Sequence, residues 1–136
     1  MDGEIAQTTM DVLFLGLDHG VDSVRASGGP LTPFVVVERG GERQLTRFAS
    51  ATLEDSIAQA VGKIRATQLE AEDCAVLVYD GYLTAPEGRF DAIYAEAIDF
   101  RGRITVVAQR YKPKARLRHF ETVGNPALLP GAHGKL

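Results

Sequence analysis

The segment VLVYDGYLTAPEGRFDAIYAEA, residues 76–97, decides the fold that we predict for this chain. β-Branched, aliphatic and aromatic residues on both sides of APEG indicate two strands joined by a tight turn. Pairing Leu83 with Phe90 across that turn places Tyr79 opposite Tyr94. The segment therefore predicts an antiparallel pair in which a few polar side chains interrupt an apolar ribbon.

Two helices are predicted before this pair. Apolar residues recur at spacings of three and four over residues 4–26, and SGGP at 27–30 supplies a terminating glycine and proline. TLED at 52–55 matches the capping-box pattern, which predicts a second helix from there to about Thr67.

Three further strands are predicted around these elements. PFVVVERGGERQLTRFA, residues 33–49, indicates a hairpin about its glycine pair, with Glu38 opposite Arg43. A last strand over residues 103–111 follows the RG turn. If Arg101 and Gly102 form a two-residue turn, this strand places Arg110 opposite Ile93.

The order α-β-β-α-β-β-β predicts an α+β domain with a two-layer architecture, in which two helices cover one face of a mostly antiparallel five-stranded sheet. We expect residues 1–112 to form this domain. Residues 113–136 contain three prolines and are expected to form an irregular tail, with a short segment near 120–123, packed on the domain or extending from it.

This element order, over about residues 4–111, resembles the profilin-like architecture of roadblock and longin domains. The resemblance lies in the order alone and in no residue motif, and the closing helix usual in roadblock proteins is missing. It implies helices packed on a five-stranded sheet and no particular activity.

Composition indicates one ordinary globular domain, with 45% hydrophobic and 24% charged residues among 136. The single cysteine, Cys74, excludes an internal disulfide, and no Cys/His cluster indicates a metal or cofactor site. The amino-terminal segment is acidic and lacks the features of a signal peptide, and the longest apolar run is too short to span a bilayer. We therefore expect a cytoplasmic protein without metal or cofactor and without membrane association.

Charge is distributed unevenly. Residues 101–118 contain seven Lys and Arg and no Asp or Glu, although the whole chain has a net charge of −3. These cations are expected to protect an exposed edge strand from pairing with other chains. The alternative is weak binding of an anionic polymer, for which the missing interleaved aromatics argue against nucleic acid.

A polar group is predicted at one end of the sheet. The registers above bring together Asp80, Tyr82, Asp91 and Arg110, which could bind a small ligand or act as acid and base. The structural alternative is an ion pair of Asp80 with Arg110, with tyrosine hydroxyls seeking partners as they are buried.

The sheet face opposite the helices is predicted to be apolar and aromatic. An exposed patch of this kind favours self-association, so we predict a homodimer. The candidate interface residues are Tyr79, Leu83, Phe90, Tyr94, Ile98 and Tyr111. The alternative is that the tail covers this face within one chain.

No catalytic motif is present: serines lack a GxSxG elbow, and histidines lack metal-ligand spacing. Cys74 begins an apolar strand, which is typical of a buried, inert thiol. The sequence therefore favours a non-catalytic homodimeric interaction module with an unknown protein partner over an enzyme. A ligand-binding domain that uses the polar cluster is the first alternative, and a polyanion binder the second.

Overall fold

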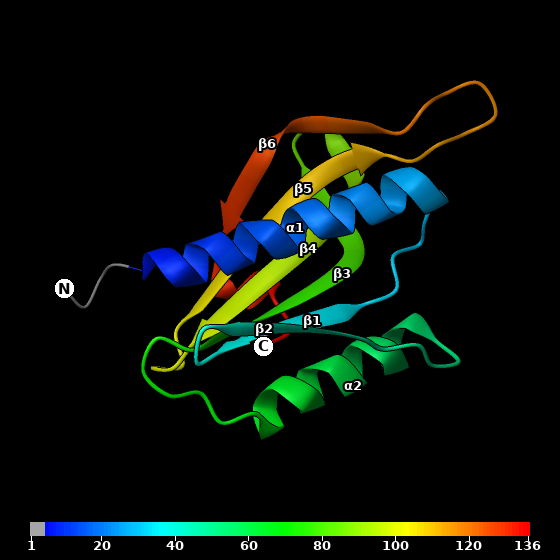
Figure 1. Cartoon of the computed structure of the whole chain (residues 1–136). Helices are drawn as coiled ribbons and strands as arrows, with labels where there is room; N and C mark the ends of the chain where they lie inside the picture. Colours follow the sequence, from blue (N-terminus) through cyan, green and yellow to red (C-terminus); the bar gives the residue numbers. More distant parts are fainter. Residues whose placement is uncertain (1–4) are drawn as a thin grey trace.

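The computed structural model describes residues 5–136. It contains two helices, a six-stranded antiparallel sheet and one short 3-10 helix (Figure 1). The strands lie in the order β2-β1-β3-β4-β5-β6. In chain order the elements are α1 (Gln7–Ser27), β1 (Phe34–Arg39), β2 (Glu42–Arg47), α2 (Leu53–Ala66), β3 (Cys74–Ala85), β4 (Gly88–Asp99), β5 (Ile104–Lys112), β6 (Glu121–Leu129) and η1 (Gly131–His133).

The local signals in the sequence are confirmed. The Thr52 hydroxyl accepts a hydrogen bond from the Asp55 amide at 3.0 Å and begins α2. Gly28 ends α1 in the left-handed conformation, with φ at 86°. Glu38 pairs with Arg43 across the β1–β2 hairpin. The expected start of α1 at residue 4 lies outside the described residues.

The predicted two-layer arrangement is wrong, because the two helices lie on opposite faces of the sheet. Helix α1 packs on the face of Val76, Val78, Ile93 and Ala95, and α2 packs on the face of Leu77 and its neighbours. The physical reason is that both faces are apolar: FVVV in β1 and CAVLVY in β3 are continuous runs, as in strands covered on both sides. A sheet of this kind needs a helix on each face.

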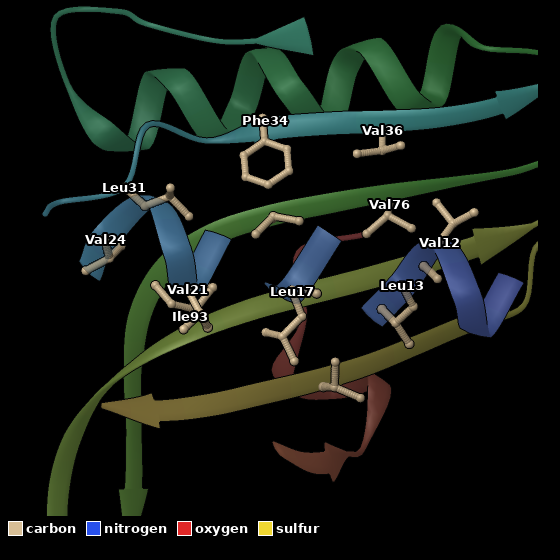
Figure 2. Close-up of a cluster of buried hydrophobic side chains, with 14 of the residues drawn as sticks. Val12, Leu13, Leu17, Val21, Val24, Leu31, Phe34, Val36, Val76 and Ile93 are labelled. Atoms are coloured by element: carbon tan, nitrogen blue, oxygen red, sulfur yellow. The ribbon is translucent and has the colours of Figure 1, made fainter. Parts of the chain in front are cut away.

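The larger core lies between α1 and the sheet (Figure 2). Leu13, Leu17 and Val24 of α1 belong to the same cluster as Phe34 and Ile93 of the sheet, and all five side chains are fully or almost fully buried. Gly20 lets the helix approach closely, since a Cβ at this position would lie 2.8 Å from a Val78 methyl group. The backbone of α1 at Gly20 therefore lies directly against the side chains of the sheet.

The expected irregular tail contains a sixth strand. β6 pairs with β5 along the sheet edge, with an irregularity between Ala108 and Arg110. There the Gln109 amide group donates to the main-chain oxygens of Val123, at 3.3 Å, and Gly124, at 3.1 Å. The irregularity lets β6 contain Gly124 and Pro126, which are tolerated at a sheet edge and interrupt further pairing there.

The predicted β3–β4 register is confirmed, whereas the β4–β5 register is wrong by one residue. Tyr79 pairs with Tyr94 as expected, but Ile93 pairs with Gln109 and not with Arg110. The turn has three residues, 100–102, because the Asp99 carboxylate accepts the amides of Arg101 and Arg103 at 3.0 and 2.9 Å. One extra turn residue exchanges the two faces of β5.

Candidate functional site

Asp80 is the centre of the polar group predicted from the sequence. Its carboxylate oxygens accept hydrogen bonds from the Tyr111 hydroxyl at 2.8 and 2.9 Å and from the Leu31 amide at 3.2 Å. Burial raises the pKa of Asp80, these hydrogen bonds oppose the rise, and the nearby charge of Asp91 adds to it. Burial also raises the pKa of Tyr111, as does its bond to Asp80. The carboxylate therefore ties together β3, β5 and the connection after α1.

A hollow of about 230 Å³ lies beside Asp80. Tyr82, Asp91 and Tyr111 contribute to its wall, together with Gly28, Gly29, Pro30 and Pro113 from the connecting segments. Tyr82 is 59% exposed, and the Arg89 guanidinium lies 3.8 Å from the centre of its ring. The structure thus brings together three of the four predicted ligand-site residues.

Arg110 is not among them, so the predicted contact between Asp80 and Arg110 is wrong. Arg110 lies on the opposite face of β5, where it forms a 3.1 Å ion pair with Glu87 and lies over the Phe90 ring at 4.8 Å. Tyr111 takes its place beside Asp80. The sequence contained a signal for this residue, because Asp99 followed by Gly102 is typical of a three-residue turn.

Asp80 with its partners Tyr111 and Leu31, here called the Asp80 cluster, supports the connection between β5 and β6. The Tyr111 ring stacks on the Phe120 ring at 5.3 Å, and the Arg25 guanidinium lies 5.2 Å from the Phe120 ring centre. Tyr111 therefore joins Asp80 to the base of the segment that leaves β5 and returns as β6. These contacts join separate parts of the chain to one another, so the arrangement has a structural role.

If Asp80 and Tyr111 form one unit, their substitutions should not be additive. We expect Asp80→Ala and Tyr111→Phe each to lower the free energy of unfolding by about 1–3 kcal/mol, since each breaks a partly buried hydrogen bond to a charged group. The double mutant should lose about 1 kcal/mol less than the sum. Urea denaturation of the four proteins measures this coupling. Asp80→Ala with Arg110→Ala is the control cycle, and a coupling as large in this control would contradict the register.

The predicted aromatic interface is not an exposed patch. Tyr79, Tyr94 and Tyr111 are buried, and Tyr111 lies on the α1 face. The Tyr79 and Tyr94 rings stack at 5.2 Å beneath α2, and burial raises the pKa of both. The partly buried candidates Leu83 and Ile98 pack against the same cluster, as do Leu129 and Leu136 from the tail, and Phe90 lies under Arg110. The basis expected for a homodimer is therefore missing, and the dimer stays a prediction.

Four of the seven basic residues of 101–118 lie in a projecting hairpin. Residues 112–119, here called the basic hairpin, begin at the last residue of β5, lead toward β6 and extend beyond the end of α1 (Figure 1). Ala115 and Arg118 exchange two main-chain hydrogen bonds, at 2.9 and 3.1 Å, around the tip residues Arg116 and Leu117. Leu117 is 96% exposed. The expectation that these cations protect β5 as an edge strand is wrong, because β6 covers that edge.

Other chemistry is sparse among residues 5–136. Burial raises the pKa of the Cys74 thiol to about 11, which agrees with an unreactive side chain. No described group of three or more His, Cys, Asp or Glu residues could hold a metal ion. Of the helices described, none is long and apolar enough to cross a membrane.

Comparison of the chain with protein-family models, curated proteins and solved structures finds no match.

Proposed function

We propose that the protein is a non-catalytic binding domain that uses the basic hairpin to contact the phosphate backbone of a double-stranded nucleic acid. The observation that carries this proposal is the projection of Lys114, Arg116 and Arg118, which follow Lys112 at the end of β5, from an otherwise acidic body. No Asp or Glu lies between residues 112 and 119, whereas the rest of the chain has 11 Lys and Arg against 18 Asp and Glu. The projection keeps the acidic body away from an anionic partner.

The shape of the hairpin supports a duplex as the partner. Two antiparallel segments closed by a two-residue turn form a narrow ribbon, and a duplex groove admits a two-stranded ribbon. The hairpin contains no Phe, Tyr or Trp on which single-stranded bases could stack, and its one ring of this kind is the imidazole of His119. The lack of these larger aromatics argues against a base-stacking platform and leaves contacts to phosphates as the main interaction.

The base of the hairpin is held firmly enough to present it. Phe120 follows the hairpin directly and lies between Tyr111 and Arg25, and the Arg118 side chain donates to the Pro113 carbonyl at 3.3 Å. The Asp80 cluster therefore contributes to this function by positioning the hairpin, and no ligand in the hollow is required.

The proposal predicts strongly salt-dependent binding. Four phosphate contacts give a slope of about −3.6 in log K against log salt concentration, so affinity for a 20-bp duplex should fall roughly 100-fold between 50 and 200 mM salt. Fluorescence anisotropy of a labelled duplex measures this slope. Reversing Arg116 and Arg118 to Glu should leave folding intact and remove about half of the slope or more.

Arg39→Glu with Lys63→Glu is the charge-matched control, because both residues are exposed and lie outside the hairpin. This control should bind with nearly the original slope. Equal losses in the two double reversals would assign binding to net charge alone. Binding to vesicles of anionic lipid without binding to the duplex would overturn the choice of partner.

A further inference from the structure

Glu96 is a fully buried carboxylate on the α2 face of the sheet, with 0% of its surface exposed. One of its oxygens accepts from the Tyr79 hydroxyl. The main-chain amides of Lys135 and Leu136 donate to the same carboxylate at 2.8–3.0 Å. A buried charge must be compensated by hydrogen bonds, and here a tyrosine and two backbone amides contribute them. The carboxylate therefore holds a stretch of main chain.

The contact selects glycine at one position of that stretch. A Cβ on Gly134 would lie 2.5 Å from a carboxylate oxygen of Glu96 and 3.0 Å from a Val106 methyl group. Carboxylate and methyl group come from adjacent strands beneath the segment, so neither can move far. Any other residue at position 134 would push the segment off the carboxylate.

A third contact selects an apolar side chain two residues later. Leu136 packs against the cluster beneath α2 and lines a hollow of about 250 Å³ with Ile64, Leu69 and Ile98. Lys135, between the two fixed positions, is exposed. The surface around Glu96 therefore fits a segment with glycine, then any residue, then an apolar residue. The main-chain amides of that segment point at the Glu96 carboxylate.

The connection between β6 and the bound segment is short. It consists of Pro130 and the single turn of η1, Gly131–His133, and Pro130, Gly131 and His133 are exposed. The strand pairing and the cluster between α1 and the sheet involve none of residues 134–136, and Leu136 alone of the three packs against the cluster beneath α2. Local opening of such a segment costs less than unfolding of the domain.

We propose that the groove between α2 and strands β4 and β5 is a peptide-binding site, which residues 134–136 occupy as a ligand within the same chain. Its partner is an extended protein segment with glycine two residues before an apolar side chain. Such a segment binds when residues 134–136 leave, so the chain's own segment acts as an intramolecular competitor. This site is independent of the basic hairpin.

The test uses the full chain with Gly134→Ala, which displaces the resident segment, and a labelled peptide PGAHGKL that reproduces residues 130–136. Fluorescence anisotropy should show at least tenfold tighter binding to Gly134→Ala than to the unmodified protein, where the tethered segment competes at an effective concentration near millimolar. The control peptide PGAHAKL should bind at least tenfold more weakly. Equal binding of the two peptides, or none to a folded Gly134→Ala protein, would refute the site.

Hydrogen exchange on the unmodified protein gives a second test that needs no variant. The amides of Lys135 and Leu136 should exchange at least 100-fold faster than the paired amides of β4, because the segment opens locally. Exchange of both sets only on global unfolding would show a permanent part of the fold and overturn the proposal. A native dimer that Gly134→Ala dissolves would assign the groove to a second copy and overturn the choice of partner.

Discussion

Replacing Glu96 with alanine is expected to lower the free energy of unfolding by about 3 kcal/mol or more. The substitution deprives the Tyr79 hydroxyl and the amides of Lys135 and Leu136 of their acceptor. Each unsatisfied buried donor costs about 1–3 kcal/mol, and the loss is limited only by how far residues 134–136 can leave and hydrate. Urea denaturation followed by circular dichroism measures the change.

Glu96→Gln is the matched control, because it keeps the shape and one carbonyl oxygen. It should retain the bond from Tyr79 but direct an amide group at the main chain, so its loss should be intermediate. Gly134→Ala displaces the segment but leaves the Glu96 side chain itself unchanged, and it should cost less than Glu96→Ala. A Glu96→Ala protein as stable as the original would mean that the buried carboxylate does not hold these donors together.

The sequence predicted those parts of the fold that depend on residues close together in the chain. Thr52 and Asp55 are three residues apart, and Glu38 and Arg43 flank the turn at Gly40 and Gly41. The short spacing of each pair is therefore enough to predict how its two residues meet. The APEG turn likewise determines the register of β3 with β4. Such signals do not depend on what the rest of the chain does.

The failures arose where a short-range pattern leaves two solutions. A two-residue turn and a three-residue turn both fit the segment after Asp99, and the difference of one residue places Tyr111 instead of Arg110 beside Asp80. No pattern within residues 53–66 indicates on which face of the sheet α2 packs. This face could be predicted only from the apolar residues Ala75 and Leu77, which make a second face of β3 too hydrophobic for water.

The prediction of an irregular tail was wrong for a different reason. Gly124 and Pro126 are typical of loops, and a central strand would exclude Pro126 because it cannot donate to a neighbour. At the sheet edge this restriction does not apply, and β6 forms there. The role of Glu96 likewise required the structure, because Gly134 and Leu136 lie about 40 residues away in the chain.

Replacing Gly20 with valine should lower the free energy of unfolding by about 3 kcal/mol and the melting temperature by about 10 °C. A Cβ there would lie 2.8 Å from a Val78 methyl group, 3.1 Å from one of Ile93 and 3.4 Å from one of Leu31, so α1 must move away from the sheet. Gly62→Val is the control, since no atom lies within 4 Å of a Cβ at that position of α2. It should change stability by less than about 0.5 kcal/mol, because valine is a slightly better helix former than glycine. Differential scanning calorimetry compares the two variants directly. Similar melting temperatures for both would show that α1 does not rest on β3 at the distance described.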